Sequence, residues 1–277
     1  MKSLQSVVIY TLRTRPFAAL CPWMFCVGFA PVGKAQEKPV IEPFAVATHG
    51  HQEMVPSDFL DCVGLETKAR WRQLYRESPP PPSSDRFRVS YALGGLIADS
   101  YLALQAGDVQ QFKNVNQDII KYCGALGLAE KVKPRMLAES KMAETEDWEG
   151  VRKQVAASQA TVEKLLADQR DDDLSLLVNL GMWLRMFEIS STLVHNDKDL
   201  QNKTLCIGSG PLLVALLARF ERISETTRKA DAVPFIGNVL DQLRKHWDNR
   251  GNGESDEDIV QMTFEKLQFL NGKMGVK

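Results

Sequence analysis

Two almost wholly apolar segments limit the folds open to this chain more than any other feature. They are residues 87–106, FRVSYALGGLIADSYLALQA, and residues 174–194, LSLLVNLGMWLRMFEISSTLV. A helix with no broad polar face must be enclosed by other elements. The most economical arrangement packs the two segments against each other at the centre of one domain.

Small residues in the first segment indicate a close approach between helices. Gly94, Gly95 and Ala98 lie within four residues of one another. A glycine inside a helix costs about 0.5–1 kcal/mol relative to alanine, so two together suggest a benefit that offsets this loss. We predict that a neighbouring element packs closely against these three positions.

Few ionic side chains interrupt the two segments, and they are the candidates for buried polar residues. Asp99 lies in the first segment, and Arg185 and Glu188 lie in the second. An unpaired buried carboxylate costs several kcal/mol, and a bidentate arginine removes most of this penalty. We therefore predict that Asp99 meets Arg185, or else reaches a helix end. A structural or specificity role is favoured over a catalytic one because no histidine, nucleophile or second carboxylate accompanies the Asp99–Arg185 pair at a recognisable spacing.

The rest of the chain shows helical periodicity and scarcely any strand signal. The fold class is therefore all-α: an irregular antiparallel helical bundle or a short helical-hairpin array, with an extended proline-containing N-terminal arm. A first helix should run from Ser57 until the prolines at 79–82 end it, and the third helix after these prolines should carry Pro134 in its first turn. Ser255 and Asp258 resemble a capping box. The expected parts are residues 1–35, 36–56, 57–84 (a helix and proline-rich spacer) and 85–272 (the helical domain).

Residues 1–35 have the pattern of an export signal. Lys2, Arg13 and Arg15 precede or flank an apolar stretch, and small residues before Gln36 suit cleavage after Ala35. The alternative is an uncleaved anchor, which would be the protein's only link to a membrane. Residues 36–56 then form the extended arm. We expect an exported protein, periplasmic or secreted, membrane-anchored if the signal remains.

Charge and cysteine content narrow the function classes further. The first 35 residues hold four of the 34 basic side chains and no acid, which leaves 30 basic against 35 acidic groups in the remainder. This excess of acid argues against nucleic-acid binding. Beyond residue 35 the cysteines are Cys62, Cys123 and Cys206, an odd number, so at least one is free or paired between chains. Cys123 falls on an apolar helix face and is expected in the core.

Three short motifs could bind ions. His49, His51 and Glu53 alternate in the extended arm, so all three could face one side and hold zinc or copper; a polar arm is the alternative. The acidic run 171–173 and the GSGP sequence at 208–211 suit helix starts better than metal or phosphate sites. We expect no cofactor.

These observations favour a non-catalytic binding or assembly module outside the cytoplasm, with a protein partner. The alternative is a metal-dependent or carboxylate-using enzyme of the cell envelope, built on the His49 cluster or on Asp99. A third option is a helical pocket for an apolar ligand between the glycine-faced helices.

Overall fold

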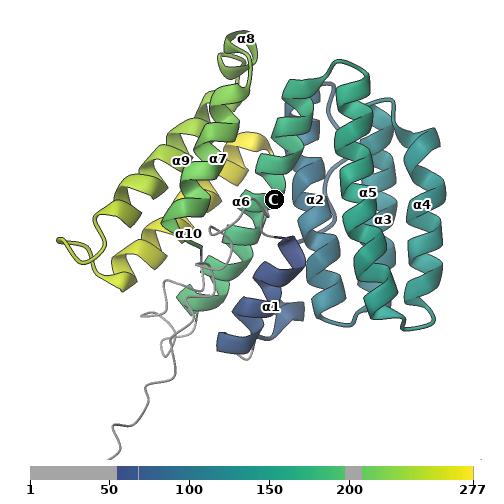
Figure 1. Ribbon diagram of the computed structural model, residues 1–277, viewed down its shortest axis with the longest axis horizontal. Coiled ribbons are helices and arrows are strands. Elements are labelled where there is room, and N and C mark those ends of the chain that lie inside the picture. Colours follow the sequence, from purple (N-terminus) through teal and green to yellow (C-terminus); the bar gives the residue numbers. More distant parts are fainter. Residues whose placement is uncertain (1–54, 68, 197–207, 277) are drawn as a thin grey trace, which may run out of the picture. The chain divides into compact units, whose positions relative to one another are not determined.

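The computed structural model describes residues 55–67, 69–196 and 208–276. These residues fold into ten α-helices and a 3₁₀ helix with no strand, which confirms the all-α class (Figure 1). The chain forms two units, Met1–Val40 and Ile41–Lys277, and every described residue belongs to the second. Within this part of the chain, no helix has both the length and the apolar character needed to span a membrane.

The elements follow one another in a simple order. They are α1 (Pro56–Thr67), the 3₁₀ helix η2 (Trp71–Leu74), α2 (Arg86–Gln105), α3 (Val109–Ala125), α4 (Ala129–Ala143), α5 (Trp148–Asp168), α6 (Asp172–Asn196), α7 (Gly210–Arg222), α8 (Glu225–Arg228), α9 (Val233–Asp248) and α10 (Asp256–Met274).

Helices α2 and α6, which hold the two apolar segments, pack directly on each other at the centre. A Cβ at Gly94 would lie 2.0 Å from the backbone oxygen of Val178, and a Cβ at Gly181 would lie 2.1 Å from that of Tyr91. Each helix therefore presents a glycine to the backbone of the other. A side chain at either position would prevent this close approach. The close approach predicted from Gly94 is present, although Gly181 was not foreseen.

The other two small residues of α2 have different surroundings. A Cβ at Gly95 would meet the guanidinium of Arg76, 3.0 Å away, and nothing of α6 within 4 Å. Ala98 is fully buried. Gly95 thus leaves room for a side chain from the irregular segment that follows η2.

The remaining helices lie on the two sides of this pair (Figure 1). On one side, α3 packs on α2, α4 on α3, and α5 on both α4 and α6. On the other side, α10 packs on α6 and α9, and α7 packs on α9 and α6. Helix α1 packs on both α2 and α6. On α6, the ring of Phe59 is 5.9 Å from that of Trp183 and 6.1 Å from that of Phe187.

Side-chain caps begin several helices. Asp85 accepts hydrogen bonds from the backbone N–H groups of Phe87 and Arg88 at the start of α2, and Ser209 caps α7. The capping box of Ser255 and Asp258 is present at α10. These bonds satisfy N–H groups that the helix itself leaves unpaired.

Two predicted helix boundaries are wrong. Helix α4 begins at Ala129, so Pro134 lies inside it and not in its first turn. Val132, ahead of the proline, is buried, and this packing holds the earlier turn in helical form. The first helix ends at Thr67, well before the prolines, where the Thr67 hydroxyl donates to the Val63 carbonyl (2.7 Å) and competes with the helical bonding pattern.

Candidate functional site

Four charged side chains meet in a buried ionic network between α2, α6 and the segment after η2. The Arg185 Nε donates to Asp99 Oδ1 at 2.8 Å, and the Arg76 Nη2 donates to Asp99 Oδ2 at 3.2 Å. Glu188 Oε2 lies 3.1 Å from Arg185 Nη1 and 3.7 Å from Arg76 Nη1. The structure thus places Asp99, Arg185 and Glu188 together and adds Arg76 as a fourth member. Two cations and two anions leave no net charge.

Arg185 is the centre of this network. It is 5% exposed, and its Nη2 also donates to the carbonyl oxygen of Leu74 at 2.8 Å. Burial alone would lower the pKa of the guanidinium, but Asp99 and Glu188 outweigh it and hold the pKa above its ordinary value. The group therefore stays charged while it joins α6 to α2 and to the end of η2.

Glu188 extends the network to the C-terminal helix. Its Oε1 accepts a hydrogen bond from Gln268 Nε2 of α10 at 3.3 Å. Its Oε2 interacts with the two arginines at ion-pair distance without the alignment of a hydrogen bond. Removal of any one of the four side chains would leave a buried charge without compensation. The four charges therefore depend on one another.

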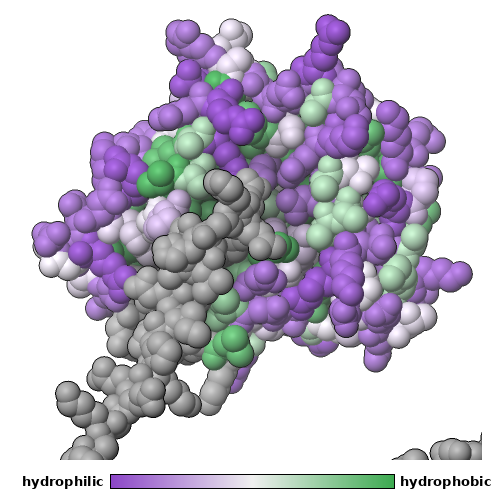
Figure 2. Space-filling model, in the orientation of Figure 1, coloured by the Kyte–Doolittle hydropathy of each residue, from purple (hydrophilic) through white to green (hydrophobic). Residues whose placement is uncertain are grey.

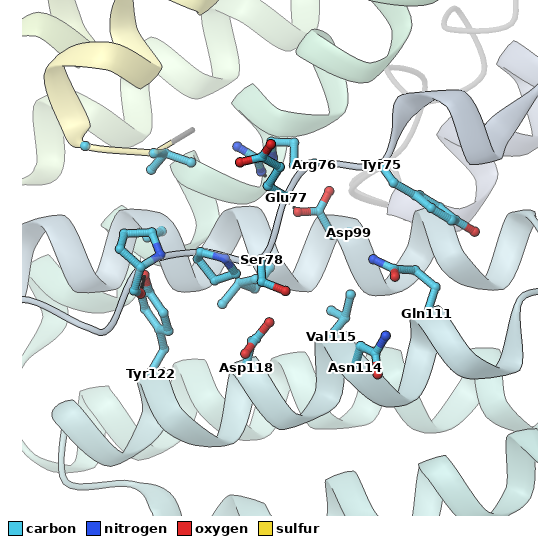
Figure 3. Close-up of a pocket in the computed structure, with 16 residues that line it drawn as sticks. Tyr75, Arg76, Glu77, Ser78, Asp99, Gln111, Asn114, Val115, Asp118 and Tyr122 are labelled. Carbon is cyan, nitrogen blue, oxygen red and sulfur yellow. Dashed lines mark hydrogen bonds and ion pairs between the residues drawn. The ribbon is translucent and has the colours of Figure 1, made fainter.

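A small polar pocket opens beside the network. Its walls come from the Tyr75–Pro80 segment, from α2 and α3, and from Gly275 and Val276 after α10, and its volume is about 70 Å³. Figure 3 shows Asp118, Asn114 and Gln111 on α3, and Asp99 on α2, facing the space beside this segment. The pocket therefore presents carboxylate and amide groups in one concavity.

Tyr122 fixes the wall of the pocket. Its hydroxyl donates to the carbonyl oxygen of Pro80 at 3.0 Å, which ties the proline-rich segment to α3. Burial, and then the nearby Asp118 carboxylate, raise the pKa of the Tyr122 hydroxyl above its ordinary value. The hydroxyl consequently remains a hydrogen-bond donor at neutral pH.

Sequence reasoning did not single out Arg76 or Asp118. Arg76 lies in an irregular segment, 23 residues before its partner Asp99, and carries no periodic signal. Asp118 lies off the apolar stripe of α3, so helical periodicity does not predict its burial. It is nevertheless only 8% exposed, because the Tyr75–Pro80 segment covers it. No pattern in the sequence marks either residue.

Glu139 is a second buried carboxylate that the sequence did not reveal. It is 2% exposed on α4 and accepts a short hydrogen bond from the Ser158 hydroxyl of α5, which in turn accepts from Arg135 Nε at 3.3 Å. Burial raises the pKa of Glu139 to about 7, against the lowering effects of Ser158 and Arg135. The surrounding cavity is about 10 Å³, the space of a single water molecule.

The acidic run at the start of α6 contacts neighbouring elements. Asp171 pairs with Arg86 at 2.7 Å. Asp173 accepts from the hydroxyls of Ser224 (2.5 Å) and Thr227 (2.6 Å). Although burial alone would raise the pKa of Asp173, these hydrogen bonds lower it. The run thus joins α6 to the turn before α8 and to α2.

The predicted metal ligands His49, His51 and Glu53 lie outside the described residues, as does Cys206. In the part that the structure describes, no group of three or more His, Cys, Asp or Glu side chains could hold a metal ion. Cys123 is fully buried, as its helix face predicted, and burial raises the pKa of its thiol to about 12. Cys62 is half-buried.

Comparison of the chain with protein-family models, with curated proteins and with solved structures finds no match. The class of protein that the fold and the site define is an all-α helical bundle with a buried ionic network and an adjoining polar pocket.

Proposed function

We propose that this protein is a non-catalytic binding module that acts outside the cytoplasm and recognises one projecting group of a protein partner. The observation that carries the proposal is the size of the pocket beside the ionic network. Pockets that enclose a small-molecule ligand usually measure about 300–1,000 Å³. At about 70 Å³, this pocket suits the end of a single side chain.

The state of the ionic network supports binding over catalysis. Asp99 is engaged by two arginines, and Glu188 by the same two arginines and Gln268. A general acid or base needs access to a substrate proton. Here the four charges hold the Tyr75–Pro80 wall of the pocket in place, which gives a rigid receptor for a partner group.

The surface beyond the pocket also suits a protein partner. Figure 2 shows a largely hydrophilic face with separate hydrophobic areas. Among the described residues, the large hydrophobic side chains that are exposed include Leu65 of α1, at 85%, and Val214 of α7, at 54%. Exposed apolar side chains of this kind add contact area when a protein partner covers them.

Chemical crosslinking in the native host tests the proposal. The full chain carries an affinity tag, and crosslinked proteins are identified by mass spectrometry. Asn114→Arg is the blocking variant, because Asn114 is exposed and lines the pocket. Gln117→Arg is the matched control, since Gln117 is exposed on the same helix but does not line the pocket.

We expect a specific partner with the wild type and with Gln117→Arg, and its loss with Asn114→Arg. Equal recovery with Asn114→Arg, or no specific partner in any sample, would overturn the proposal. Fractionation of the same cells tests the location. Recovery of the protein in the cytoplasmic fraction would contradict export.

A further inference from the structure

More carboxylates than cations line the pocket between α2, α3 and the Tyr75–Pro80 segment. Its lining includes three carboxylates, Glu77, Asp99 and Asp118, and one guanidinium, Arg76. Asp99 is already bound by Arg76 and Arg185 on its two oxygens. Asp118 is therefore the buried carboxylate that remains available to a ligand.

The geometry of Asp118 supports this assignment. The residue is only 8% exposed. Its Oδ1 accepts from Lys121 Nζ at 2.7 Å, and Lys121 itself is 63% exposed on the outer side. Its Oδ2 has no hydrogen bond to any residue that the structure describes. This oxygen is not one of the fully buried atoms that lack a partner, so it is accessible from the pocket and can accept a hydrogen bond from a ligand.

The neighbours of Asp118 add acceptors and a short apolar wall. Gln111 and Ser78 in the same lining supply an amide and a hydroxyl oxygen, and Leu96 and Val115 are apolar members of it. A primary ammonium has three donors and no acceptor, and its charge is compact. Its alkyl stem can lie along the apolar wall while its head reaches the oxygens.

Volume limits how much of a ligand can enter. At about 10–15 Å³ of cavity volume for each water molecule, a cavity of about 70 Å³ holds about five. An ammonium head with the adjoining part of its stem fits that space, whereas a sugar or a nucleotide does not. The remainder of the ligand must stay outside the pocket.

We propose that this pocket is a binding site for a primary alkylammonium group, the end of a lysine side chain of the partner, with Asp118 as its main acceptor. The inference rests on the proposed function and names the group that the pocket recognises. Arg76 and the ionic network position the opposite wall.

Titration of the isotope-labelled full chain with n-butylammonium, followed by NMR, tests the site. Sodium butyrate and 1-butanol serve as anionic and neutral probes of the same length, at constant ionic strength. We expect saturable shifts of the Gln111 and Asn114 side-chain amide signals with n-butylammonium alone. Equal shifts with butyrate or butanol, or no saturable shift at tens of millimolar, would overturn the site.

Variants identify the acceptor. Asp118→Asn should weaken n-butylammonium binding at least tenfold, and Asn114→Arg should abolish it. Asp168→Asn is the control, because Asp168 is an exposed acid in an ion pair with Lys164, away from the pocket. Unchanged affinity in Asp118→Asn, with a folded spectrum, would remove Asp118 from the site. A further control, Gln117→Arg, should bind as the wild type does.

The two proposals can fail separately. Loss of the crosslinked partner in Asn114→Arg without any ammonium binding would leave the binding module and refute the ammonium site. If the wild type binds n-butylammonium but Asn114→Arg still crosslinks to the partner, the ammonium site is supported and the proposed role of the pocket in partner recognition is refuted.

Discussion

The buried pair of Asp99 and Arg185 offers a quantitative test of the ionic network. In the wild type, the four charges of Arg76, Asp99, Arg185 and Glu188 sum to zero. Asp99→Asn leaves a net charge of +1 inside the protein, and Arg185→Met leaves −1. The double variant returns to zero and keeps Arg76 and Glu188, which lie 3.7 Å apart in the wild type.

The expected energies follow from these charges. Removal of one partner from a buried pair costs about 3–5 kcal/mol, because the other charge remains buried without compensation. We expect each single variant to lose about that much, and the double variant to lose at least about 2 kcal/mol less than their sum. The Leu74 carbonyl loses its Arg185 donor in both the single and the double variant, so this effect cancels from the coupling energy.

Urea unfolding followed by circular dichroism measures the four free energies of unfolding. A second cycle on Lys164 and Asp168, which are 73% and 55% exposed, is the control, and its coupling should be below about 1 kcal/mol. The Asp99–Arg185 coupling should persist in high salt, since buried charges are screened little. Additive losses, within about 0.5 kcal/mol, would refute the direct interaction.

Further predictions concern Glu139, the helix crossing and Cys123. Because the pKa of Glu139 rises from 4.5 to about 7 on folding, the folded state holds a proton between these pH values that the unfolded state has released. The free energy of unfolding should therefore fall by up to about 3 kcal/mol as pH rises from 4.5 to above 7. Denaturation at several pH values should show that Glu139→Gln removes this dependence. An unchanged slope would contradict the assignment. Gly94→Ala should cost at least about 1–3 kcal/mol of stability, because its Cβ would overlap the α6 backbone. The control Gly124→Ala, whose Cβ would have its nearest contact at 3.8 Å, should be neutral or stabilising in thermal unfolding. Equal melting temperatures for the two variants would contradict the close crossing. The buried Cys123 thiol should react with a thiol reagent at pH 7.5 only after denaturation, and rapid labelling of the folded chain at this residue would count against its burial.

The sequence carries enough information to predict the centre of this fold. The apolar character of α2 and α6 demanded mutual burial, and the rarity of charge in both helices pointed to the contact between Asp99 and Arg185. Gly94 marked the crossing, because a glycine inside a helix needs a packing reason.

The polar residues around this centre could not be predicted in the same way. Arg76 and Asp118 owe their burial to the Tyr75–Pro80 segment, whose path along α2 and α3 depends on tertiary contacts. Glu139 lies among lysines and other polar residues, so helical periodicity alone cannot distinguish it from a solvated side chain. The start of α4 was missed because the packing of Val132 outweighs the preference of Pro134 for a first turn.

The paired glycines of α2 and α6 have a consequence for motion. Gly94 and Gly181 each accommodate a main-chain segment of the facing helix, so an axial displacement by one residue would drive a side chain into that segment. Sliding of these two helices past each other is thereby blocked. Any rearrangement of the helices is therefore expected in the outer layers, with the α2–α6 pair as the stationary frame.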